Sequence, residues 1–160
     1  MSTSDNDTYL GDAGANNNIA DFDGGDDLFI GYGGNDSFVG GGGDDYIIGG
    51  AGNDRLTGGA GDDVLRAGTG NDYLGGGTGN DLLLGLLGDN KLNGGVGEDI
   101  LVAGSGDNVL VGGSDSDKFV FTDKFGGHGE AKVVDFTIGE DSLHIISDTV
   151  TEFGDLTFSY

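Results

Sequence analysis

The stretch Gly49-Gly50-Ala51-Gly52-Asn53-Asp54-Arg55-Leu56-Thr57 repeats along most of the chain as a unit of nine residues. The sixth position of the unit holds an aspartate in Asp27, Asp36, Asp45, Asp54, Asp63, Asp72, Asp81, Asp99 and Asp117, and an asparagine in Asn90 and Asn108. The fourth position is glycine in every unit until Asp115 breaks the rule. The eighth position is apolar: Phe29, Phe38, Ile47, Leu56, Leu65, Leu74, Leu83, Leu92, Leu101, Leu110 and Phe119. Eleven consecutive units in one register define the fold.

Each unit combines a glycine-rich turn of six residues with a strand of three, such as Tyr46-Ile47-Ile48. Glycine allows the turn to adopt positive φ and to approach an ion closely. Because side chains alternate across a strand, the middle residue points inward and its neighbours point outward. Two units make one coil, and coils stack at about 4.8 Å. Each inward Leu, Ile or Phe therefore packs on the one a coil earlier.

The unit resembles G-G-x-G-x-D-x-U-x, the calcium-binding nonapeptide of the repeats-in-toxin (RTX) family of secreted bacterial proteins. One such motif would be a weak signal, but this copy number makes the resemblance specific over residues 22–120. The resemblance implies an all-β fold: a right-handed parallel β-roll, which is a solenoid with two units per coil and a capping segment at each end.

Turns on the same side of the roll lie eighteen residues apart, so the sixth positions form two columns. The first column is Asp27, Asp45, Asp63, Asp81, Asp99 and Asp117; the second is Asp36, Asp54, Asp72, Asn90 and Asn108. Calcium prefers six to eight hard oxygen ligands. We expect it between adjacent turns of a column, bridged by two carboxylates. The resemblance adds backbone carbonyls, which for the gap between Asp27 and Asp45 are those of Asp23, Gly25, Gly40 and Gly42.

The two columns are not equivalent. The first has five gaps with aspartate on both sides, whereas the second has two, followed by an Asp/Asn and an Asn/Asn gap. We therefore expect about seven to eight calcium ions, with tight binding in the first column and weak or no binding around Asn90 and Asn108. Two alternatives remain: the asparagines are drift in a redundant array, or Asp89 and Asp107 substitute for them after a local backbone change.

The composition agrees with folding that requires calcium. The chain has 29 acidic and 6 basic side chains, a net charge of −23, 37 glycines and no proline. Such a chain repels itself and loses much conformational entropy on ordering. Because calcium would neutralise the carboxylates, its binding energy would also be folding energy. We expect the calcium-free chain to be largely unfolded.

The chain divides into three segments. We expect residues 1–21 to form a degenerate capping coil, residues 22–120 the eleven repeats, and residues 121–160 a C-terminal cap, to which the resemblance adds a secretion signal. In the first segment, Asn6–Leu10 ends one unit and Gly11–Asn16 starts the next, and two extra residues separate this pair from the regular array. In the last, Val133–Phe136 and Leu143–Ile146 are expected strands around a Gly139-Glu140-Asp141 turn, and the segment resembles the cap that follows RTX repeats.

The expected location is extracellular. The chain has no cysteine, and residues 1–18 are polar, which argues against a cleaved N-terminal signal peptide. The resemblance implies type I secretion directed by an uncleaved C-terminal signal, for which residues 152–160 are the candidate. The acidic balance argues against nucleic acid as a partner and against membrane insertion.

One sheet is expected to have an apolar outer face. Its outward residues include Leu28, Tyr46, Val64, Leu82 and Ile100, whereas those of the other sheet are mostly polar. Large exposed apolar patches mark contacts. We therefore expect this face to be covered by the C-terminal segment, a second copy or a partner domain; the alternative is that β-propensity alone fills these positions.

No catalytic motif is present. The two histidines, His128 and His144, have no metal-ligand spacing, and the chain lacks a G-x-S-x-G elbow, a cysteine nucleophile and a P-loop. The sequence indicates a calcium-binding module rather than an enzyme. Two alternatives remain: the non-catalytic C-terminal part of a secreted protease, lipase or alginate epimerase, or a self-assembling adhesin or surface protein that uses the apolar outer sheet.

Overall fold

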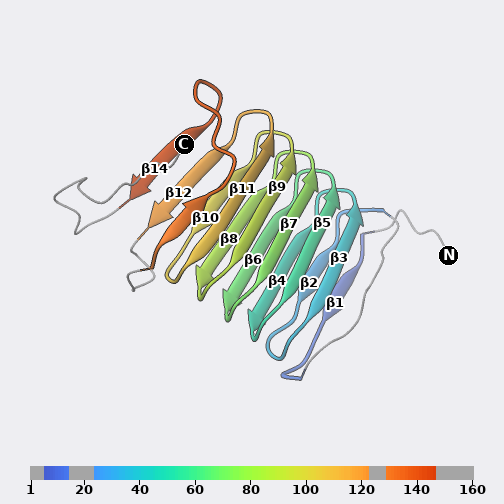
Figure 1. The fold of residues 1–160 in the computed structure, drawn as a ribbon. Helices are drawn as coiled ribbons and strands as arrows, with labels where there is room; N and C mark the ends of the chain where they lie inside the picture. The colour runs from blue at the N-terminus through green and yellow to red at the C-terminus, as the bar shows by residue number, and fades with distance from the viewer. Residues whose placement is uncertain (1–5, 15–23, 123–128, 147–160) are drawn as a thin grey trace.

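A computed structural model describes residues 6–14, 24–122 and 129–146, and these residues form strands and turns without any helix (Figure 1). The strands are β1 (Thr8–Leu10), β2 (Leu28–Ile30), β3 (Ser37–Gly42), β4 (Tyr46–Ala51), β5 (Arg55–Ala60), β6 (Val64–Thr69), β7 (Tyr73–Thr78), β8 (Leu82–Leu87), β9 (Lys91–Val96), β10 (Ile100–Ala103), β11 (Asn108–Ser114), β12 (Lys118–Thr122), β13 (Ala131–Val133) and β14 (Ser142–Ile146). With no helix in the described part, no helix there could span a membrane.

The strands form two parallel sheets that face each other. One sheet has eight strands in the order β1-β2-β4-β6-β8-β10-β12-β14, and the other has six in the order β13-β11-β9-β7-β5-β3. From β2 onward the chain alternates between the sheets, and Figure 1 shows the coils advancing in one direction from the N-terminal to the C-terminal end. This confirms the all-β parallel β-roll that the sequence predicts.

The register follows the repeat. In the eight-stranded sheet Tyr46 pairs with Val64, and Val64 pairs with Leu82, so each residue lies beside the one eighteen residues later. At the N-terminal end Thr8 pairs with Leu28, an offset of twenty that accommodates the two extra residues predicted there. At the other end Lys118 pairs with Ser142, and the offset widens again as the repeats stop.

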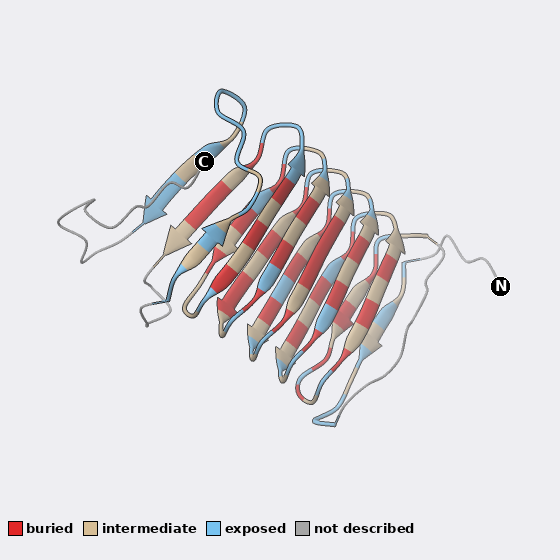
Figure 2. Cartoon of the chain, in the orientation of Figure 1, coloured by how far each residue is buried: buried red, intermediate tan, exposed pale blue. Residues whose placement is uncertain are grey.

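The eighth-position residues form the core between the sheets. All eleven, from Phe29 to Phe119, are at most 1% exposed, and Figure 2 shows them as buried segments crossing every central strand. Fully burying one such side chain is worth about 1.5–3 kcal/mol, and each packs on the same position of the next coil. Aromatic rings lie at both ends, where Tyr9 packs on Phe38 and Phe136 packs on Phe119.

The predicted strand length of three residues is wrong for most of the array. Strand β4 continues through Gly49 and Gly50 to Ala51, and Gly50 still pairs with Gly68 of the next coil. In β3 to β9 the first three residues of the turn therefore remain in the sheet, because glycine at positive φ keeps the backbone paired while it bends. The cap strands also differ in extent: β13 ends at Val133, so the predicted strand through Phe136 is wrong, whereas β14 contains the whole of Leu143–Ile146.

Candidate metal centre

The turns rest on residues at positive φ in the second and fourth positions of the unit. Gly50 and Gly52 have φ values of 113° and 130°. Where the fourth position lacks glycine, Asp115 still adopts a φ of 80°. The turn geometry is therefore held along the array even where the residue is less suited to it, because each turn stacks on the turn one coil away.

The sixth-position residues point inward from the turns and form what we call the inner ladder. Each is at most 3% exposed. Within the columns, the Oδ1 atom accepts a hydrogen bond from the backbone N–H of the sixth-position residue one coil earlier: the Asp27 N–H donates to Asp45 at 2.8 Å, and the Asp45 N–H donates to Asp63 at 2.8 Å. The structure thus brings the predicted residues of each column together, one per coil.

The second carboxylate oxygen of the inner ladder lacks a hydrogen-bond donor. Among the residues that the structure describes, the buried Oδ2 atom has no such partner in Asp27, Asp45, Asp54, Asp63, Asp72, Asp81 and Asp99. A buried polar atom left unsatisfied costs about 1–3 kcal/mol, and a charged one costs more. A row of such oxygens has the chemistry of a cation site.

At several of these carboxylates, Oδ2 and a backbone carbonyl oxygen both lie beside the first-position glycine of the turn. A β-carbon at Gly40 would collide with Asp45 Oδ2, and would also come within 2.7 Å of the Gly58 carbonyl oxygen. The same arrangement recurs at Gly94, with Asp99 Oδ2 and the Gly112 carbonyl oxygen. First-position glycines thus allow close approach rather than positive φ, although the Asp72 turn has Ala67 in this position. Gly58 and Gly112 hold the first position of the next turn in the column, and the resemblance assigns the carbonyl of that position to calcium.

The donor set consists of side-chain and backbone oxygens together. Within the described part of the chain, no group of three or more acidic or histidine side chains forms a metal-binding cluster, so backbone carbonyls would complete each site. For the gap between Asp27 and Asp45, the Gly25 carbonyl lies against Gly43, and the Gly42 carbonyl lies 3.6 Å from the position of a β-carbon on Gly24. Asp23, the other predicted carbonyl ligand, lies outside the described residues.

Burial makes the inner carboxylates resist ionisation in the metal-free roll. Desolvation raises the pKa of Asp63 and Asp99 to about 7, and that of Asp45, Asp54 and Asp117 to about 6. The charges of neighbouring aspartates raise these pKa values further, while the backbone hydrogen bond to Oδ1 lowers them. A bound cation would reverse this balance, because it favours the ionised form.

The two asparagines occupy the inner ladder but make different contacts. Asn90 and Asn108 are each 1% exposed, and their amide nitrogens donate to backbone carbonyl oxygens of their own turns. The neighbouring Asp89 and Asp107 lie outside the inner ladder. Both are exposed: Asp89 accepts the Asp107 N–H at 2.8 Å, and Asp107 accepts the Glu130 N–H at 2.9 Å.

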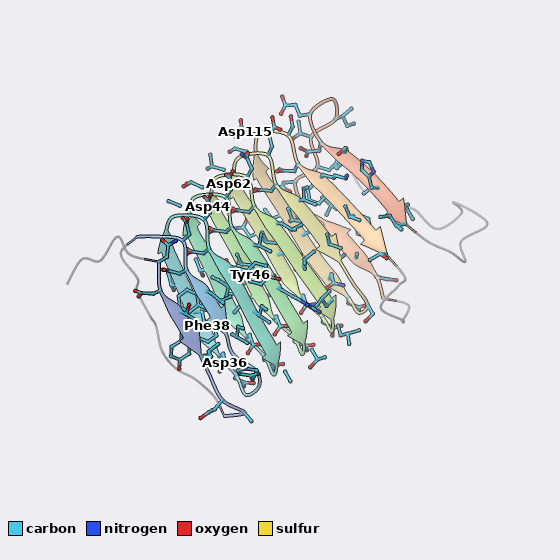
Figure 3. All side chains as sticks on the ribbon, turned by 180° about the vertical axis from the view of Figure 1, so that it is seen from behind. Asp36, Phe38, Asp44, Tyr46, Asp62 and Asp115 are labelled. Carbon is cyan, nitrogen blue, oxygen red and sulfur yellow. The ribbon has the colours of Figure 1, made fainter. Side chains whose placement is uncertain are left out.

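These contacts belong to an outer ladder that the sequence reasoning missed. In it, the Oδ1 atom of each fifth-position residue accepts the N–H of the fifth-position residue one coil later, as when the Asp62 N–H donates to Asp44 at 2.8 Å. Figure 3 shows Asp44 and Asp62 in line along one edge of the roll, with Asp36 of the second column at the opposite edge. The signal was present in the sequence, since the fifth position is Asp, Asn or Glu in every unit before Ser116.

Two cap carboxylates bind the backbone of the last turn of the array, and Asp141 ends the first column of the inner ladder. Asp141 Oδ1 accepts the Asp117 N–H at 2.9 Å, and its Oδ2 accepts the Thr137 N–H at 2.7 Å. The Asp135 carboxylate accepts the N–H groups of Gly112 and Gly113, both at 2.9 Å. Both oxygens of each cap carboxylate therefore have donors, in contrast to those of the inner ladder.

Comparison with protein families matches three stretches of the chain, residues 23–56, 48–83 and 84–119, to the family model described as "RTX calcium-binding nonapeptide repeat (4 copies)". Together these stretches cover more than half of the 160 residues. A comparison with curated proteins gave no match.

Proposed function

Because the chain belongs to the RTX calcium-binding nonapeptide repeat family, we propose that it binds several calcium ions between its stacked turns and folds as it binds them. The observation that supports this most strongly is the row of buried Oδ2 atoms without hydrogen-bond donors. These oxygens are spaced one per coil in each column. At Asp45, Asp54, Asp81 and Asp99, the first-position carbonyl oxygen of the next turn lies beside the same glycine as Oδ2.

The proposed ligands are the sixth-position aspartates and the carbonyls of the adjacent turns. Five gaps of the first column and two of the second have a carboxylate on both sides, and the Asp72/Asn90 gap has one, which gives about seven to eight ions at most. In the gap between Asp27 and Asp45, the carbonyls of Gly25, Gly40 and Gly42 would complete the site together with that of Asp23.

Calcium binding and folding are coupled in this proposal. Without a cation, the roll must either bury ionised carboxylates that lack donors or protonate them. A net charge of −23 adds repulsion between the coils. The capping segments, 1–21 and 121–160, would close the ends of the array. Such a module suits an extracellular bacterial protein that leaves the cell unfolded by type I secretion and folds where calcium is abundant, and it needs no catalytic residue of its own.

The test is a circular dichroism titration with calcium, starting from chelated protein, with magnesium as the control. We expect a steep, calcium-selective gain of β signal from a disordered baseline. Isothermal titration calorimetry on the same samples would then count the ions. A chain that is fully folded in chelator and unchanged by calcium would contradict the proposal.

A second proposed role, self-association or docking of a partner domain, rests on the outer face of the eight-stranded sheet. Its register places Leu28, Tyr46, Val64, Leu82 and Ile100 in one row, and Tyr46 and Ile100 are 41% and 38% exposed. Size-exclusion chromatography in calcium would test this role. A Leu82→Thr/Ile100→Thr variant should elute as a smaller species than the parent, and identical elution as a monomer would contradict self-association.

A further inference from the structure

The asparagines of the second column sit in the same orientation as the aspartates around them. The Asp72 N–H donates to Asn90 Oδ1 at 2.9 Å, and the Asn90 N–H donates to Asn108 Oδ1 at 3.1 Å. Since the atom that accepts an N–H must be the amide oxygen, the amide nitrogen takes the place that Oδ2 holds in an aspartate.

In that place the amide nitrogen binds the carbonyls that would otherwise face a cation. Asn90 Nδ2 donates to the carbonyl oxygens of Gly85 at 3.0 Å and Gly88 at 3.1 Å. Asn108 Nδ2 donates to the Gly106 carbonyl oxygen at 2.9 Å, with longer contacts to those of Gly104 and Ser105. Asn90 thus uses both of its amide protons, and its turn has a hydrogen-bond donor where the aspartate turns have none.

The carbonyl oxygen beside Asn90 also differs from those beside the aspartates. The backbone of this turn is otherwise regular: Leu86 holds the second position with a φ of 63°, as Tyr32 does in the Asp36 turn with a φ of 67°. A β-carbon at Gly85 would lie 3.2 Å from Asn90 Nδ2 and 3.5 Å from the Val102 carbonyl oxygen. At the aspartates the corresponding oxygen is the first-position carbonyl of the next turn, so the oxygen arrangement of the aspartate gaps is not reproduced here.

We infer that Asn90 and Asn108 close their turns to calcium: their amide nitrogens donate to carbonyl oxygens of the same turns, while each Oδ1 atom keeps the inter-coil hydrogen bond that the aspartates also make. The inference rests on the proposed calcium function and identifies the two turns that would not bind calcium. The C-terminal part of the second column is then a calcium-independent seam, which involves β9 and β11. The first column and the turns of Asp36 and Asp54 depend on the cation.

The test compares the full chain with an Asn90→Asp/Asn108→Asp variant. We expect calorimetry to count more calcium ions in the variant. We also expect hydrogen exchange in limiting calcium, where the parent chain is folded but only partly loaded, to show lost amide protection in β9 and β11. The matched control is Asn53→Asp/Asn71→Asp, which adds the same charge to the exposed outer ladder, where Asp retains the accepting Oδ1 atom. This control should leave both the ion count and the protection unchanged.

A second pair of variants keeps the inference testable if the double aspartate variant does not fold. Asp54→Asn and Asp54→Ala both remove one inner carboxylate, but only asparagine can donate to the carbonyls of the turn. We expect both to bind fewer ions, and only Asp54→Asn to gain amide protection in the same limiting calcium. Equal protection in the two variants, or an unchanged ion count in Asn90→Asp/Asn108→Asp, would overturn the inference. If the parent chain binds no calcium, the proposed function fails first, and the inference fails with it.

Discussion

The inner and outer ladders carry the same carboxylate and amide groups on adjacent residues, yet their hydrogen bonds run in opposite directions. Asp63 accepts the N–H of Asp45, one coil earlier, whereas Asp62 accepts the N–H of Asn80, one coil later. Asp63 is 1% exposed, and Asp62 is exposed. Water can solvate the second oxygen of Asp62, but the second oxygen of Asp63 is sealed without a donor. Burial therefore makes one carboxylate dependent on a cation and leaves its neighbour a local hydrogen-bond acceptor.

The largest expected effect comes from Asp63→Ala. The substitution removes a carboxylate from two gaps and leaves the Asp45 N–H without its acceptor. Losing one partner of a buried charged group costs about 3–5 kcal/mol. Urea unfolding in saturating calcium should show a loss of this size, and calorimetry should count fewer ions. A loss below about 1 kcal/mol would mean that the two ladders are equivalent.

The next effect is the pH dependence of the inner ladder. In the metal-free roll, burial raises the pKa of Asp63 and Asp99 to about 7, from an ordinary value of 3.8. A raised folded-state pKa stabilises the metal-free roll at low pH, and that stabilisation is lost as the pH rises through about 7. In chelator, lowering the pH from 7.5 to 5 (roughly across these pKa values) should therefore increase the β signal.

Calcium binding should show the opposite trend over the same range, because calcium binds the ionised carboxylates. The calcium midpoint in circular dichroism should rise as the pH falls below about 7. A midpoint that does not change with pH would indicate that the inner carboxylates are not the ligands.

A smaller effect is expected from a substitution that adds a β-carbon beside an inner carboxylate without changing its charge. A β-carbon at Gly58 would collide with Asp63 Oδ2, so Gly58→Ala should displace the carboxylate and cost about 1–3 kcal/mol. The control is Gly75→Ala, where the nearest atom to the new carbon would be in the Tyr73 ring at 3.5 Å. That change should be neutral or stabilise by about 0.4–1 kcal/mol. Equal unfolding midpoints for the two variants would contradict the close approach.

The smallest effect should come from Asp62→Ala in the outer ladder. The substitution removes an exposed acceptor, and the Asn80 N–H can bind water instead. We expect a change of about 0.5 kcal/mol or less in urea unfolding, with the same ion count as the parent. A loss as large as that of Asp63→Ala would show that the exposed carboxylates also hold calcium.

The sequence predicted the coils, the two columns and the apolar core because each follows from a strict period. The two extra residues near the N-terminus were also readable, and they appear as the offset between Thr8 and Leu28. The role of Asn90 could not be predicted from the sequence. The sequence shows only that a charge is missing at this position. The hydrogen bonds of Asn90 depend on which atom of its amide faces the carbonyls of Gly85 and Gly88. The sequence also could not show whether a fifth-position side chain accepts from the coil before it or from the coil after it, because both coils have similar residues at that position.

The eighteen-residue register also constrains how such a molecule can change in length. Removing two consecutive units would delete one coil, and every later residue would keep its sheet and its column. Removing a single unit would keep the apolar residues inside and the aspartates in turns. Every later strand, however, would move to the opposite sheet. Strands with apolar outer residues such as Leu82 would then continue the six-stranded sheet. Insertions and deletions of an even number of units therefore leave the outward residues of each sheet unchanged in kind. An odd number of units would give later strands of each sheet the outward residues of the other sheet.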